Sequence, residues 1–218
     1  MPSNRRVILA ERPRYIVPTA NCFRVESAPE PVAGAGQLVI RTQYLSMDVM
    51  LYSRVQNVAG GNQPIALDAP MLGPAVGIVE VSNHPDFKAG DEVSGYWAWQ
   101  ERVLSDGSRL RKLDFGVQRP SYGVSAYGAS GFGAYVALNV LAVPQVGETV
   151  VVGTALGGLG HIAGQISRLK GCRVVGIAGG DDGFEATAAA CFDGAEAGDI
   201  REDGQAEGGA HGTAQNFG

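Results

Sequence analysis

A glycine-rich segment, residues 153–160 (GTALGGLG), constrains the fold more than any other feature, because it separates two different apolar patterns. Residues 148–152 (ETVVV) form a short apolar run typical of a strand buried in a parallel sheet. Residues 160–170 place Ile162, Ile166 and Leu169 on one helical face, and residues 172–178 (CRVVGIA) form a second buried run. The pattern predicts one βαβ unit with a right-handed crossover.

The spacing of small residues in this segment matches the dinucleotide-binding fingerprint A-x-G-x-x-G, with Ala155, Gly157 and Gly160 at its fixed positions. Gly157 allows the backbone to approach a pyrophosphate, and Gly160 allows the helix to pack closely on the strand. Amides at the helix start, beginning near Gly158, carry a partial positive charge of about +0.5. We therefore expect a nucleotide to bind at Ala155, Gly157, Gly158 and Gly160. The alternative interpretation is a tight turn whose glycines serve only packing.

An acidic residue about 20 positions beyond the last glycine of this motif accepts the ribose 2′-hydroxyl and repels a 2′-phosphate. Asp181 stands 21 positions after Gly160. The local chemistry therefore favours NAD over NADP. An aspartate that only caps or solvates a loop is the alternative interpretation.

The N-terminal half has a different pattern, with short strands between turn signals. Residues 37–41, 75–81 and 92–99 are rich in strand-forming residues, and residues 83–86 (NHPD) and 88–91 (KAGD) have turn chemistry. We expect a small β-barrel here, followed by a helix over residues 126–141. The predicted domains are residues 1–120 and 121–218.

Beyond residue 180 the chain has too few large apolar groups to build a core. Of the 40 residues from 179 to 218, 19 are glycine or alanine. We expect a short helix at residues 184–191 and then a mobile acidic segment, because such a composition does not offset the entropy of the chain.

Charge and composition limit the kinds of ligand and environment that suit this chain. A net charge of −5 leaves no basic surface for nucleic acid, and glycines and a proline interrupt the long uncharged run between residues 119 and 148, which argues against a membrane span. The three cysteines lack the spacing of a metal cluster or a disulfide framework, so we expect no metal and a cytoplasmic location. A small molecule is the expected ligand.

Candidate catalytic residues are few. Asp48, Tyr52 and His161 carry groups suited to acid–base chemistry or hydrogen bonding. The aromatic residues Tyr52, Trp97 and Tyr127 are candidates for the lining of a substrate pocket. For Trp97 core packing is the stronger alternative, since aromatic residues in strands usually pack. For His161 a turn or packing role is the stronger alternative.

Several stretches carry a resemblance to a known family: residues 82–91 (SNHPDFKAGD), 106–114 (DGSRLRKLD), 147–152 (GETVVV), 164–166 (GQI) and 170–180 (KGCRVVGIAGG). Over about the first 200 residues the chain resembles the zinc-independent medium-chain dehydrogenase/reductase family, in particular the enone reductases similar to prostaglandin reductase and leukotriene B4 dehydrogenase. The resemblance implies a GroES-like β-barrel domain followed by a Rossmann domain. It also implies NADPH-dependent reduction of an α,β-unsaturated carbonyl.

The sequence departs from the family at positions that serve the cofactor. Where the family reads D-P-Y-M-R, this chain reads DVMLY at residues 48–52, and Gly133 replaces a common threonine. By the resemblance, Gly183 replaces the lysine that meets the 2′-phosphate and Gly198 replaces a tyrosine near the adenine. The family continues for well over a hundred residues further, so we expect a C-terminally truncated chain with a partial Rossmann domain.

Three functions stay open from the sequence. The first is an oxidoreductase that uses NADP or NAD on an α,β-unsaturated carbonyl or related small molecule. The second is a cofactor-independent cyclase, isomerase or dehydratase that reuses a reductase scaffold. The third is a non-catalytic binding or assembly protein, in which the edge of the strand around residues 174–178 is exposed and a homodimer covers it.

Overall fold

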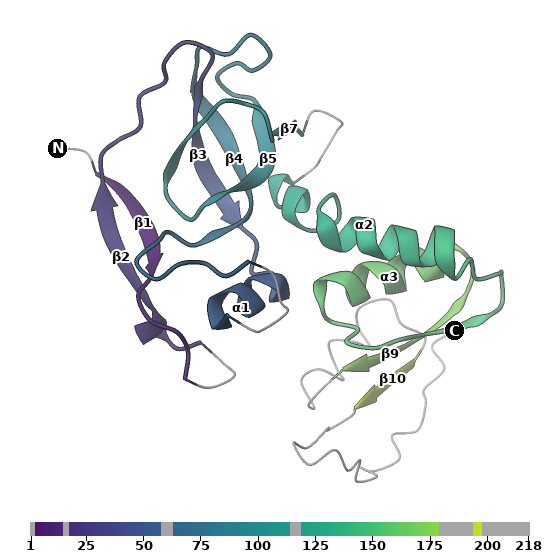
Figure 1. Ribbon diagram of the computed structural model, residues 1–218. Coiled ribbons are helices and arrows are strands. Elements are labelled where there is room, and N and C mark those ends of the chain that lie inside the picture. Colours follow the sequence, from purple (N-terminus) through teal and green to yellow (C-terminus); the bar gives the residue numbers. More distant parts are fainter. Residues whose placement is uncertain (1–2, 15–17, 58–62, 114–118, 179–193, 198–218) are drawn as a thin grey trace. The chain divides into compact units, whose positions relative to one another are not determined.

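The computed structural model describes residues 3–14, 18–57, 63–113, 119–178 and 194–197. The chain forms two compact units, Met1–Val124 and Ser125–Gly218, here called the N-terminal and C-terminal units (Figure 1). The helix predicted at residues 184–191 and the acidic tail lie outside the described residues.

Two antiparallel sheets build the N-terminal unit. The larger has the order β6-β3-β4-β5-β7, formed by β3 (Leu38–Leu45), β4 (Leu72–Ser82), β5 (Glu92–Ala98), β6 (Arg102–Ser105) and β7 (Arg111–Lys112). The smaller pairs β1 (Asn4–Leu9) with β2 (Phe23–Ala28), and isolated bridges connect β1 to Pro70 and Gln100. Across the described residues the strand ladders do not close into a ring, so the predicted barrel is an open arrangement of two sheets. Short 3₁₀ helices, η1 (Ala20–Cys22) and η2 (Pro120–Val124), complete this unit.

Inward-facing residues of the larger sheet form the main core of this unit. Leu38, Ile40, Val79 and Val93 are completely or almost completely buried and pack with Trp97. Each such side chain contributes about 1.5–3 kcal/mol when it leaves water. The predicted strands at residues 37–41, 75–81 and 92–99 are thereby confirmed as parts of β3, β4 and β5.

Helix α1 (Val49–Gln56) begins and ends with specific caps. The Asp48 carboxylate accepts a hydrogen bond from the Met50 amide at 2.8 Å, and Asn57 ends the helix in the left-handed region at φ 61°. Leu51 and Val55, four residues apart, are buried on the face that packs inward. The sequence analysis did not predict this helix.

The C-terminal unit contains the predicted βαβ unit. Strand β8 (Thr149–Val152) is followed by α3 (Gly158–Leu169), β9 (Arg173–Ala178) and β10 (Gly194–Ala197), and the parallel sheet has the order β10-β9-β8. The predicted helix at residues 126–141 is confirmed as α2 (Ala129–Val136), which continues as the π-helical segment η3 (Ala137–Leu141). The predicted exposed edge at β9 is wrong, because β10 pairs with that edge.

Helix α2 lies beside α3 in this unit (Figure 1). Small residues make the contact close, since Ala134 and Ala163 are buried in the same cluster as Leu138. The Lys170 ammonium also donates a hydrogen bond to the Asn139 side-chain oxygen at 3.2 Å. The two helices therefore pack as a pair.

Ser167 on α3 provides a test of this packing. Its side chain is completely buried, and its hydroxyl has no hydrogen-bond partner among the described residues. A buried hydroxyl without a partner costs about 1–3 kcal/mol, so we expect Ser167→Ala to raise the melting temperature by a few degrees. Thermal unfolding measures this, with Ser53→Ala as a control, because the Ser53 hydroxyl donates to the Met50 carbonyl at 2.9 Å. A lower melting temperature for Ser167→Ala would show that the hydroxyl makes a stabilising hydrogen bond.

Candidate functional site

The glycine-rich turn connects β8 to α3 and is fixed by main-chain hydrogen bonds. The Ala155 amide donates to the Ile177 carbonyl of β9 at 2.9 Å, and the Gly157 amide donates to the Thr154 carbonyl at 2.8 Å. Thr154 itself has a left-handed backbone, with φ 52°. The turn is therefore held in a defined shape by main-chain groups, and Ala155 is completely buried within it.

Gly160 has no room for a side chain. A Cβ atom at this position would lie 2.3 Å from the Thr154 carbonyl oxygen and 3.1 Å from the Ala155 Cα. A Cβ at Gly157 would lie 3.1 Å from the same carbonyl oxygen. The start of α3 thus packs directly on the turn, so the turn residues, rather than the strand that the sequence analysis predicted, require glycine at position 160.

The start of α3 has the features of an anion-binding site. The first amides of a helix, here those of Gly158, Leu159 and Gly160, have no acceptor one turn earlier. No side chain caps this end, because the N-cap residue is Gly157. The helix ladder begins with the His161 amide, which donates to the Gly157 carbonyl at 2.8 Å. These uncapped amides, with the helix dipole behind them, suit a phosphate group.

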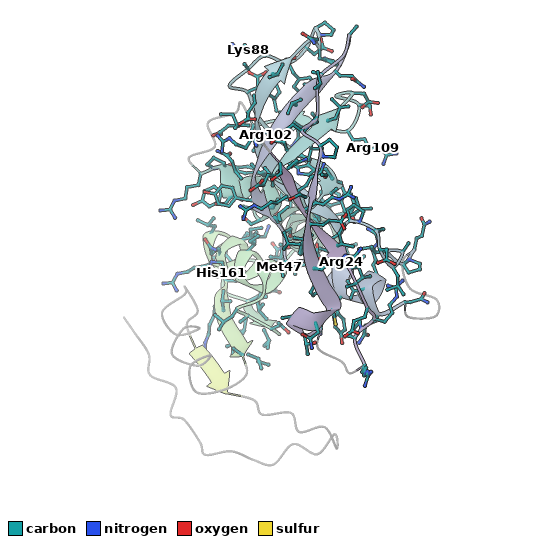
Figure 2. All side chains as sticks on the ribbon, turned by 90° about the vertical axis from the view of Figure 1, so that its left-hand side faces the viewer. Arg24, Met47, Lys88, Arg102, Arg109 and His161 are labelled. Carbon is teal, nitrogen blue, oxygen red and sulfur yellow. The ribbon has the colours of Figure 1, made fainter. Side chains whose placement is uncertain are left out.

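His161 lies at this helix start, with its side chain exposed (Figure 2). It is the fourth residue of α3 and therefore lies near Gly157, Gly158 and Gly160. Its catalytic role stays a prediction. Asp181, Gly183 and Gly198, which the sequence analysis associated with the adenosine half of the cofactor, lie outside the described residues.

The N-terminal end of α2 also contacts the turn. A Cβ at Gly158 would lie 3.1 Å from the Ser130 hydroxyl oxygen, and a Cβ at Gly133 would lie 3.0 Å from a Leu159 methyl group. The side chain of a threonine at position 133, which is common in the family, would therefore lie too close to the Leu159 side chain. Glycine at this position allows α2 to pack closely on the start of α3.

In the N-terminal unit, Asp48 and Tyr52 both belong to α1. The Asp48 carboxylate acts as the helix cap, which is a structural role. The half-buried Tyr52 phenol accepts a hydrogen bond from the Gln56 side-chain amide at 2.6 Å. Since the amide nitrogen is the donor, the phenol keeps its own proton for donation to another group.

Trp97 and Tyr127 occupy different environments. Trp97 is 6% exposed, packs in the core of the larger sheet and donates its indole hydrogen to the Thr42 hydroxyl at 3.1 Å. This placement favours the packing interpretation over a role in a substrate pocket. Tyr127 belongs to the C-terminal unit and is exposed.

Arg54 is a polar residue of α1 that the sequence analysis missed. Its guanidinium donates to the Gln63 carbonyl at 2.8 Å and to the Tyr96 hydroxyl, and it lies 5.8 Å from the centre of the Tyr96 ring. The Tyr96 hydroxyl in turn donates to the Leu72 carbonyl at 3.3 Å. No sequence signal identified these residues, because the partners are distant in the chain.

A search of the described part of the chain finds no group of three or more His, Cys, Asp or Glu side chains arranged to hold a metal ion. Within the same residues, none of the helices combines the length and the apolar character needed to cross a membrane.

Comparison with known proteins identifies the family. Residues 5–113 match the family described as the N-terminal domain of oxidoreductase. The NADPH-dependent curcumin reductase of Escherichia coli is 42% identical over 177 residues, which are 81% of this chain and 51% of that protein. Prostaglandin reductase 1 of Rattus norvegicus is 32% identical over 76% of this chain and 49% of its own length. The chain therefore spans about half the length of these relatives.

A solved structure gives the same result. The structure of CurA from Vibrio vulnificus in complex with NADPH superimposes with a TM-score of 0.79 and 36% identity, over 88% of this chain and 57% of that protein. The fold class expected from the sequence, a GroES-like domain followed by part of a Rossmann domain, is thereby confirmed. Its sequence, its fold and these relatives together show that the chain belongs to the zinc-independent medium-chain dehydrogenase/reductase family.

Proposed function

We propose that this protein is an NADPH-dependent oxidoreductase that acts on a small α,β-unsaturated carbonyl compound. The observation that carries the proposal is the turn at the start of α3, where the first amides are uncapped and Gly160 leaves no space for a side chain. Relatives named as NADPH-dependent curcumin reductase and CurA in complex with NADPH support the choice of cofactor and substrate class.

The residues present fit the phosphate part of the cofactor. The amides of Gly158, Leu159 and Gly160 would hold a pyrophosphate oxygen through main-chain hydrogen bonds. When bound, the nicotinamide would supply a hydride to the conjugated double bond of the substrate. All these amides come from one helix start, so phosphate binding does not depend on a charged side chain.

Tyr52 is the residue that we propose for contact with the substrate. Its phenol accepts from Gln56 and has its own proton available, so it can donate to the carbonyl oxygen of an enone. Donation to that oxygen withdraws electrons from the conjugated double bond and stabilises negative charge that develops on the oxygen. Asp48 has no part in this proposal, because its carboxylate caps α1.

The choice between NADPH and NADH rests on two opposing signals. Asp181 favours NAD by its spacing, whereas the relatives are named for NADPH. We propose NADPH because those relatives are 42% and 36% identical to the chain over 81% and 88% of its length. We further propose a cytoplasmic homodimer, in which β10 rather than a partner chain covers the edge of β9.

Separate titrations with NADPH and NADH test the proposed function. We expect NADPH to quench the tryptophan fluorescence and to bind at least about 10-fold more tightly than NADH, which corresponds to about 1.4 kcal/mol. We also expect loss of NADPH absorbance only when an enone such as 4-phenyl-3-buten-2-one is present. Conversion of the enone without any nicotinamide would instead establish the cofactor-independent alternative.

Tyr52→Phe tests the proposed substrate contact. Loss of one hydrogen bond to the substrate carbonyl is worth about 1 kcal/mol or slightly more, so we expect kcat for the enone to fall about 10-fold. NADPH affinity should not change. Tyr44→Phe is the matched control, because Tyr44 is an exposed tyrosine on β3 of the same unit. Equal kcat values for Tyr52→Phe and the wild type would exclude Tyr52 as a hydrogen-bond donor in the reaction.

A further inference from the structure

Arg12, which follows β1, makes an unusual set of hydrogen bonds. Its guanidinium donates to three main-chain carbonyls, those of Arg54 at 3.1 Å, Val55 at 2.7 Å, and Ile65. The side chain is partly buried, and no carboxylate among the described residues pairs with it. Among the described residues, main-chain dipoles therefore compensate the charge.

Two of these carbonyls belong to the last turn of α1, which is the negative end of the helix dipole. A cation that hydrogen-bonds the last carbonyls of a helix satisfies acceptors that have no partner inside the helix. The Arg54 carbonyl also accepts the Ile65 amide at 3.1 Å. Arg12 thus ties the end of α1 to the segment that contains Ile65.

Helix α1 depends on such ties for its position. It has eight residues, and a helix of that length is marginal without tertiary contacts. Its N-terminal cap is local, because the Asp48 carboxylate bonds only to the Met50 amide two residues away. The buried contacts of Leu51 and Val55, together with Arg12, connect it to the rest of the unit.

Tyr52 and its partner Gln56 lie on the same helix, and Gln56 is in the last turn that Arg12 holds. A shift of that turn would move the amide that orients the Tyr52 phenol. We propose that Arg12 is the positioning residue that sets where Tyr52 presents its hydroxyl to the enone, a role that rests on the proposed function. In this role Arg12 acts through α1, by its contacts with the Arg54 and Val55 carbonyls.

Fluorine NMR of the full chain labelled with 3-fluorotyrosine tests the positioning step without any assay of activity. The chain has seven tyrosines, and the signal that disappears in Tyr52→Phe is the signal of Tyr52. We expect Arg12→Met to shift or broaden this signal, and Arg12→Lys, which keeps the cation with one donor nitrogen, to restore it in part. Arg14→Met is the matched control, because Arg14 is exposed two residues away.

Steady-state kinetics on the same variants test the functional consequence. We expect Arg12→Met to lower kcat for 4-phenyl-3-buten-2-one by up to about 10-fold, the loss expected for Tyr52→Phe, to leave the affinity for NADPH unchanged, and to be partly rescued by Arg12→Lys. NADPH affinity is spared because the phosphate turn belongs to the C-terminal unit. A general loss of folding would instead weaken the binding of both NADPH and the enone and change the chemical shifts of all tyrosine signals.

The outcomes separate the two proposals. An unchanged Tyr52 signal in Arg12→Met overturns the positioning role, whether or not the protein reduces enones. A changed Tyr52 signal with an unchanged kcat for the enone also overturns it. Absence of turnover and of NADPH binding in the wild type refutes the proposed function, and with it the role of Arg12 toward a substrate, while the NMR result still decides whether Arg12 holds α1.

Discussion

Gly160→Ala is expected to lower the affinity for NADPH by about 100-fold or more, because it disturbs the amides that hold the phosphate. The added Cβ would lie 2.3 Å from the Thr154 carbonyl oxygen, a main-chain atom that cannot move without a change in the turn. Backbone strain of this kind costs about 1–3 kcal/mol, and each lost hydrogen bond to a charged group about 1.5–3 kcal/mol. Fluorescence titration and the melting temperature of the same variant measure binding and stability separately.

Gly153→Ala is the matched control for this experiment. Gly153 belongs to the same turn, but a Cβ there would have no atom within 4 Å. We therefore expect Gly153→Ala to retain wild-type affinity and stability. If Gly160→Ala remained folded with unchanged affinity for NADPH, the turn would have no role in phosphate binding.

Gly131→Ala is expected to destabilise the C-terminal unit by about 3 kcal/mol or more, which corresponds to about 6–12 °C in melting temperature. A Cβ at this position would lie 1.7 Å from the Ala126 carbonyl oxygen and 2.5 Å from its carbonyl carbon. Both atoms belong to the main chain of the turn that precedes α2, so no side-chain movement can relieve the clash.

Thermal unfolding and circular dichroism measure this effect. Phe132→Ala is a suitable control, because Phe132 neighbours Gly131 on α2 and is 71% exposed. Exposed substitutions usually change stability by less than about 0.5 kcal/mol. A melting temperature of Gly131→Ala equal to that of the control would mean that the start of α2 adjusts at no cost.

The sequence predicted the βαβ unit because its signals are local. The apolar run of β8, the helical spacing in α3 and the glycines between them each depend on neighbouring residues. Helix α1 was missed because eight residues carry too little periodicity, and its position depends on distant contacts such as those of Arg12. The pairing of β1 with β2 was missed for a similar reason, since about a dozen residues separate the two strands.

The error at β9 has a compositional cause. Its second neighbour, β10, reads GAEA and contains no β-branched or aromatic residue, so propensity gave no sign of a strand there. Main-chain pairing with β9 defines that strand instead. Strands that complete an existing parallel sheet need less intrinsic preference than strands that begin one.

The candidate site shows the same division. The tight glycine-rich turn between β8 and α3 could be predicted because glycine spacing encodes main-chain geometry directly. The hydrogen-bond partners of Trp97 and Arg12 could not, because they are a hydroxyl 55 residues away and carbonyl groups that every residue carries. Carbonyl acceptors have no residue type, and sequence patterns therefore cannot reveal them.

The proposed binding of the pyrophosphate by main-chain amides at the start of α3 has a consequence for protein engineering. The pyrophosphate is common to NADH and NADPH, so a turn without charged side chains treats the two alike. Designers could therefore alter the preference between the two cofactors at positions outside residues 153–160 and keep the turn as a fixed module. Substitutions near the ribose could then be selected without loss of the proposed hydrogen bonds to the pyrophosphate, because main-chain amides supply those bonds.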